Sequence, residues 1–124
     1  MKLSRNRFDV IVKRAIERIP VEFREHLDNM IITVQARPSP ELLVEMGFEP
    51  DEPLLGLYTG VPLPERSAFE PPLYPDQIYI FQQPLQEICN TIEELEEEIE
   101  ITVVHEVAHY LGIDEDRLAE LGYE

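Results

Sequence analysis

Basic residues are scarce in this sequence, and cysteine is almost absent. The 124 residues hold ten Lys and Arg against 26 Asp and Glu, which gives a formal net charge of −16. A field of that sign repels phosphate backbones, so we expect no nucleic-acid partner. The one cysteine, Cys89, cannot form an internal disulfide, and we expect it to be a small core residue in a protein of a reducing compartment.

Long apolar runs are missing as well. The N-terminus, Met1 to Arg7, carries charges and leads directly into an amphipathic pattern, without the apolar core of a signal peptide. No stretch approaches the roughly eighteen apolar residues that a membrane span requires. We therefore expect a cytoplasmic protein with no membrane partner. The hydrophobic content of 44% suits one domain over residues 1–124.

The charges are divided unevenly along the chain. Residues 1–37 hold eight Lys and Arg and five acidic residues, whereas residues 38–124 hold two basic and twenty-one acidic residues. The negative field of the second part favours basic peptides or cations as partners. The basic side chains of the first part are expected to pair with the protein's own acids or with water; they include Arg7, Lys13, Arg14 and Arg18.

The most informative motif is His105-Glu106-Val107-Ala108-His109. On a helix the two histidines lie four positions apart and rise about 6 Å along one face, so both imidazoles can bind one Zn²⁺. Glu106 then turns toward a metal-bound water as the general base. The motif is typical of zinc-dependent hydrolases.

A long, uninterrupted helix is predicted to carry this motif. Thr91 and Glu94 have the spacing of a capping box, and neither Gly nor Pro occurs from Thr91 until Gly112, which ends the helix in a left-handed conformation. The glutamates between positions 93 and 100 are expected to form a solvated face. The apolar stripe at helical spacing that faces the core consists of Ile92, Leu95, Ile99 and Val103.

A third metal ligand can come from the residues after Gly112. Glu115 stands ten positions after His105, between Asp114 and Asp116. Two histidines and one carboxylate leave a fourth zinc position open for water, as catalysis requires. Asp114 can instead be the N-cap of a short terminal helix over residues 115–121. We favour Glu115 as the ligand, with Asp114 and Asp116 as alternatives.

Elsewhere the sequence predicts further helices and a small sheet. One helix ends at Pro20, where a second begins, and another runs from Ser39 to Gly47. Strands are predicted at residues 30–36, 54–58 and 77–81, the first of them buried. Strand 77–81 either offers an edge that binds an extended peptide or is paired within the sheet. The proline-rich connection from Gly60 to Asp76 is expected to border the cleft.

The pattern His105-Glu106-x-x-His109-x-x-Gly112-x-x-Glu115, together with residues 55–63 and 65–67, resembles the short bacterial zincin-like metallopeptidases. The resemblance spans most of the chain. It implies an α+β fold in which a small mixed sheet packs on helices, with the active-site helix near the C-terminus. It also implies that His105 and His109 bind the metal and that Glu106 is the general base. That family usually has Asp where Glu115 stands, and the methionine turn of the larger metzincins is missing after the histidine motif.

The expected function is zinc-dependent hydrolysis of a peptide bond in a peptide or protein substrate, with Glu106 as the base. A further electrophile is expected to stabilise the oxyanion, and the tyrosines are its candidates: Tyr58, Tyr74, Tyr79, Tyr110 and Tyr123. Two alternatives stay open. In the first, the protein binds zinc or peptides with little or no turnover. In the second, it is a metal-dependent nuclease, which the acidic charge disfavours.

Overall fold

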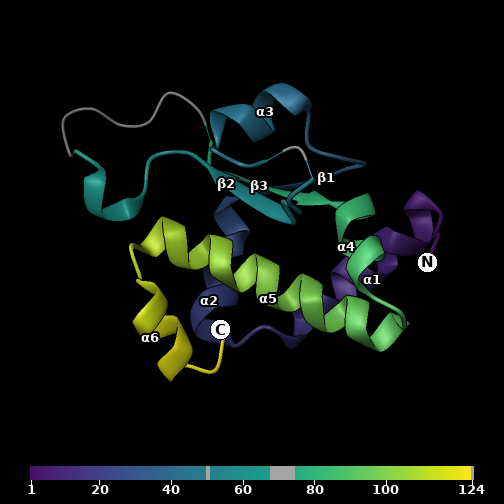
Figure 1. Ribbon diagram of the computed structural model, residues 1–124. Coiled ribbons are helices and arrows are strands. Elements are labelled where there is room, and N and C mark those ends of the chain that lie inside the picture. The colour runs from purple at the N-terminus through teal and green to yellow at the C-terminus, as the bar shows by residue number, and fades with distance from the viewer. Residues whose placement is uncertain (50, 68–74, 124) are drawn as a thin grey trace.

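The computed structural model describes residues 1–49, 51–67 and 75–123. Three strands form one mixed sheet in the order β1-β3-β2; they are β1 (Ile31–Gln35), β2 (Gly56–Thr59) and β3 (Gln77–Phe81). β1 runs parallel to β3, and β2 runs antiparallel to it. Figure 1 shows this sheet between the short helix α3 (Pro40–Glu45) and the long helix α5 (Ile92–Leu111). The α+β fold with a small mixed sheet is therefore confirmed.

Several of the remaining helices contact α5. The N-terminal helix α1 (Arg5–Arg18) packs along it, and the short elements α2 (Val21–Arg24) and η1 (Glu25–Asn29) follow. A 3-10 turn, η2 (Leu63–Glu65), lies between β2 and β3, and α4 (Gln82–Ile88) connects β3 to α5. The last helix, α6 (Glu115–Glu120), turns away from the end of α5 (Figure 1). Within the described residues, no helix combines the length and apolar character needed to cross a membrane.

The hydrophobic core lies on the face of the sheet that α5 covers. Ile78 and Ile80 of β3 are fully buried there, in one cluster with residues of α1 and α5. Tyr79 and Phe81 lie on the opposite face, where their rings stack with centroids 6.5 Å apart. This division follows from the alternation of side chains along a strand. β3 thus separates the motif helix from the α3 side of the sheet.

The structure decides between the two interpretations of residues 77–81 and corrects the predicted burial of β1. β3 is the central strand, hydrogen-bonded on both sides, so residues 77–81 are paired within the sheet and offer no edge for an added peptide. β1 was expected to be buried, but it lies at the sheet edge, with its middle residues half-buried and its ends exposed. Helix α4 was not predicted, although its proline lies in the first turn, where a missing N–H costs no intrahelical hydrogen bond.

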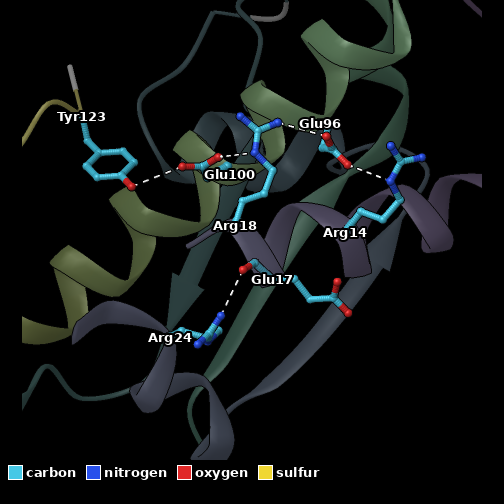
Figure 2. A network of polar contacts seen from close by, with 7 residues as sticks. All are labelled: Arg14, Glu17, Arg18, Arg24, Glu96, Glu100 and Tyr123. Carbon is cyan, nitrogen blue, oxygen red and sulfur yellow. Dashed lines mark hydrogen bonds and ion pairs between the residues drawn. The ribbon is translucent and has the colours of Figure 1, made fainter. Parts of the chain in front are cut away.

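Ion pairs join α1 to α5, as Figure 2 shows. Arg18 lies 3.0 Å from both Glu96 and Glu100, and Arg14 lies 2.9 Å from Glu96. The glutamate side chains are only 12% and 14% exposed. Glu100 also accepts a hydrogen bond from the Tyr123 hydroxyl at 3.2 Å. The predicted pairing with the protein's own acids is therefore confirmed for Arg14 and Arg18, and the glutamate run is not uniformly solvated.

Candidate functional site

Helix α5 places the histidine motif in its C-terminal half. The helix begins at Thr91, whose hydroxyl accepts from the Glu94 N–H at 3.1 Å, and ends at Gly112, which has a φ of 74°. The Glu94 carboxylate accepts from the N–H of Asn90 rather than from that of Thr91, which modifies the predicted capping box. Three of the four predicted stripe residues are fully buried, which fixes the rotation of the helix. That rotation turns the motif toward β2.

Glu106 is buried beneath β2, with 8% of the residue exposed. Its Oε1 accepts a hydrogen bond from the Tyr58 backbone N–H at 2.7 Å and lies 3.4 Å from Nδ1 of His109. Both contacts are at the same oxygen, so Oε2 makes no hydrogen bond within the part of the chain that is described. A backbone donor from a paired strand gives the carboxylate one orientation.

Gly56 allows β2 to approach α5 so closely. A Cβ at this position would lie 2.5 Å from Cγ2 of Thr102 and 3.8 Å from Cγ of Glu106. The shorter distance is one that real Cβ atoms do not adopt, since a tightly packed core cannot yield by that amount without strain. The absence of a side chain at the start of β2 is therefore part of what holds the strand over the motif.

The two histidines differ in their surroundings. Nε2 of His105 is buried and has no hydrogen-bond partner among the described residues. The hydrogen bond to Glu106 raises the pKa of His109, and the charges of Glu106 and Glu115 act in the same direction, against burial. A buried imidazole nitrogen without a partner is costly unless it binds something. Two imidazoles one turn apart, one of them with such a nitrogen, fit a zinc ion.

The acidic residues after Gly112 have separate positions. Asp114 is the N-cap of α6, and its Oδ1 accepts from the Arg117 N–H at 2.9 Å, which confirms its alternative interpretation as a cap. Glu115 and Asp116 are exposed in the first turn of that helix. Within residues 1–49, 51–67 and 75–123, no group of three or more His, Cys, Asp or Glu side chains is placed to hold a metal. The ligand role of Glu115 stays a prediction.

A polar cluster lies beside the motif, built from the connection between β2 and β3. The Tyr58 hydroxyl donates to Oδ1 of Asp76 at 2.6 Å, and Nη2 of Arg66 lies 2.6 Å from both Asp76 oxygens. Burial and the neighbouring Asp76 carboxylate raise the pKa of Tyr58 well above its usual value. The guanidinium of Arg66 lies 5.1 Å from the ring centroid of Tyr110, immediately after His109. The described part of this connection therefore borders the motif, as predicted.

Sequence reasoning missed Asp76 and assigned no role to Arg66. Asp76 is 8% exposed, and Gly60 leaves room for its contact with Tyr58, because a Cβ there would lie 2.4 Å from Oδ1 of Asp76. The Gly60 φ of 150° is also one that side chains rarely adopt. The sequence shows only that Gly60 lies near the end of a predicted strand. It gives no signal that Asp76, sixteen residues later, is buried against that glycine.

The tyrosine candidates are now distinguishable by position. Tyr58 donates to Asp76, Tyr79 lies on the far face of the sheet, and Tyr123 donates to Glu100. Tyr74 lies outside the described residues. Tyr110 packs edge-on against Tyr58, with ring centroids 5.8 Å apart, and its hydroxyl makes no hydrogen bond in the portion of the chain described. Tyr110 directly follows His109 in the sequence, and its hydroxyl is free to bind a substrate atom within the described structure. It is therefore the candidate that we favour.

An α+β protein that packs an HExxH helix against a small mixed sheet, with the glutamate held by the neighbouring strand, has the architecture of a zincin. The model of the zincin-like metallopeptidase family matches residues 27–123, so the chain belongs to this family. Membership implies zinc binding in general and associates the chain with zinc peptidases as a class.

A solved structure shares the fold. It is described as a conserved hypothetical protein from "Thermo thermophilus" and aligns with a TM-score of 0.58 over 95% of this chain and 99% of that chain. The two sequences are 23% identical, so the likeness concerns the fold alone. Among curated proteins, none matches the chain significantly.

Proposed function

We propose that the protein is a zinc-dependent metallopeptidase that hydrolyses peptide bonds in peptide or protein substrates. The observation that carries the proposal is that Glu106 is buried and accepts a hydrogen bond from the Tyr58 backbone at only one of its oxygens. Carboxylates are rarely buried unless they are paired or functional. Glu106 lies between the two histidines of an HExxH motif, and one of its oxygens accepts a hydrogen bond while the other accepts none from the described residues. Such an arrangement suits a group that must accept a proton at one defined atom.

His105 and His109 are the proposed zinc ligands, and Glu115 is the proposed third. The unpartnered Nε2 of His105 supports the first assignment, and the spacing of Glu115, ten positions after His105, supports the third. Asp114 is less suitable, because its carboxylate already caps α6. When bound at these residues, zinc supplies a Lewis acid that polarises a carbonyl and lowers the pKa of a coordinated water.

Glu106 is the proposed general base and later the general acid. The Tyr58 N–H holds Oε1, so Oε2 is the atom that takes a proton from the attacking water and passes it to the leaving amine. Tyr110 is the proposed donor to the oxyanion, since its hydroxyl is uncommitted within the described structure and follows His109 directly. Both Arg66 and Tyr58 contact its ring, which limits the positions that the ring can take.

The test separates metal binding from chemistry. Glu106→Gln is expected to retain one zinc per chain and to lose at least ~100-fold in kcat on a peptide library, because the amide cannot accept the proton. His105→Ala is expected to lose the zinc itself. Glu97→Gln, an exposed change on the same helix, is the matched control and is expected to behave like the wild type. Zinc is measured by elemental analysis of protein purified without a histidine tag.

Other outcomes favour the alternatives. If wild type and Glu106→Gln bind zinc and the same peptides but are equally inert, the protein is a binding protein that has kept the site without turnover. If an RNA substrate is cleaved in a zinc-dependent and Glu106-dependent reaction while peptides are not, the protein is a nuclease. An absence of zinc from wild type, even after zinc is supplied, would refute the enzyme proposal.

A further inference from the structure

The cavity beside Glu106 contains an acidic side chain that the proposed chemistry does not use. The cavity has a volume of about 320 Å³ and lies between α5 and residues 54–56, with His105 and Glu106 in its lining. Glu98 lines it too, seven residues before His105 on α5. Two helical turns correspond to about 10 Å along the same face, so Glu98 lies at the end of the cavity away from the motif.

Glu98 differs from Glu96 and Glu100, which are also partly buried on this helix. Those two glutamates pair with Arg14 and Arg18, as Figure 2 shows. Glu98 is half-buried and makes no hydrogen bond or ion pair within the described residues. In the described lining of the cavity there is no Lys or Arg to compensate it. A half-buried carboxylate without a partner attracts a cation.

The walls between the motif and Glu98 are largely apolar. Leu54, Leu55 and Ile101 line the cavity, and Leu54 is 7% exposed. Lys and Arg pack their aliphatic stems against such surfaces while the charged head reaches a polar end. The volume is at the lower end of the range for ligand sites, which suits one side chain rather than a folded partner.

We propose that this cavity is a subsite that binds a Lys or Arg side chain of the substrate near the scissile bond, with Glu98 as the residue that determines this specificity. The inference rests on the proposed peptidase function and deepens it, because it names a substrate class. The stem of the bound residue lies along Leu55 and Ile101, and its cationic head pairs with Glu98. The acidic field of the protein adds to the attraction at longer range.

The test uses peptides of Ala and Gly that differ at one position, which is Lys, norleucine or Glu. Norleucine keeps the stem of Lys without its charge. Binding is measured by fluorescence anisotropy with the zinc-loaded Glu106→Gln protein, so no turnover is needed. In that background Glu98→Gln removes the proposed partner, and Glu97→Gln removes the same charge from the exposed face as the matched control.

The Lys peptide is expected to bind about fivefold more tightly than the norleucine peptide at low salt, the gain of one partly screened ion pair. Glu98→Gln abolishes this preference, Glu97→Gln retains it, and Glu98→Lys shifts the preference to the Glu peptide. The same order is expected for kcat/KM with the catalytically intact protein. Circular dichroism of each variant verifies that it is folded.

Several results would overturn the subsite. A preference for Lys that survives in Glu98→Gln, or that Glu97→Gln removes equally, would mean that the general field of the protein is responsible. Equal binding of the Lys and norleucine peptides, with hydrolysis that still depends on Glu106, would refute the subsite and leave the peptidase proposal intact. A zinc-loaded protein that neither binds nor cleaves any of the peptides would refute both.

Discussion

Gly56 controls the distance between the strand that orients Glu106 and the helix that carries it. We expect Gly56→Ala to lower the free energy of unfolding by about 2 kcal/mol, because the new Cβ would meet Cγ2 of Thr102 at 2.5 Å. Urea denaturation measures the change. Thr102→Ala removes the clashing methyl group, so the double variant is expected to recover part of the loss. Strictly additive effects would show that this contact is not the cause.

Cys89 is buried at the end of α4 and is a core residue, as predicted. Burial, together with the charges of Glu98 and Glu94, raises the pKa of its thiol to about 11. As the pH rises, the thiol ionises in the unfolded chain, near pH 9, before it ionises in the folded protein, near pH 11. The free energy of unfolding is therefore unaffected by this group below pH 9 and falls as the pH rises from 9 to 11.

The measurement compares wild type with Cys89→Ala by denaturation at several pH values. We expect the wild type to lose about 2 kcal/mol relative to the variant between pH 9 and 11, since each pKa unit corresponds to about 1.4 kcal/mol. The comparison cancels the titration of other groups. A pH-independent difference would show that the thiol titrates alike in the folded and unfolded states.

At the scale of elements, ion pairs fix α1 against α5. We expect Arg18→Met to lower the free energy of unfolding by about 1 kcal/mol, because Glu96 keeps Arg14 but Glu100 loses its arginine. The Arg18 side chain is 45% exposed, so water screens the pairs and the effect stays modest.

The control is Arg5→Met, whose partner Asp9 belongs to the same helix and whose pair is exposed on both sides. That variant is expected to change stability by less than about 0.5 kcal/mol. Raising the salt concentration to about 1 M should reduce the Arg18→Met effect, because salt screens partly exposed pairs. An effect independent of salt would indicate that lost packing of the arginine stem is responsible instead.

At the scale of the whole molecule, α5 connects the elements, since it contacts α1, α2, α4, η2 and two strands. Zinc bound on this helix would therefore oppose global unfolding. At a free zinc concentration of about 100 Kd we expect a stabilisation of about 2.7 kcal/mol, which for a domain of this size corresponds to a rise in Tm of roughly 10 °C.

Scanning calorimetry with and without zinc measures that shift. His105→Ala is expected to abolish it, whereas His26→Ala is expected to retain it. His26 is a suitable control because its ring packs against Tyr110, with centroids 5.8 Å apart, yet it lies outside the proposed ligand set. Loss of the shift in both variants would mean that the ligand set includes His26, and retention in both would place the zinc elsewhere.

Local signals in the sequence determined α5, the helix that carries the histidine motif. Thr91 and Gly112 delimit α5, Asp114 caps α6, and β3 covers the predicted residues 77–81. These features depend on hydrogen bonds and backbone conformations within a few residues, so the amino-acid pattern alone predicts them. The family resemblance carried by the histidine motif was likewise readable and is confirmed by the match over residues 27–123.

The tertiary structure alone decided how the site is assembled. The order of the strands made β3 central rather than an edge, which the period of its side chains cannot reveal. The hydrogen bond from Tyr58 to Glu106 spans 48 positions, and the cavity that extends from the motif to Glu98 requires residues 54–56 to pack on α5. Contacts between residues so distant in the chain depend on packing of the whole core, and no local pattern encodes that packing.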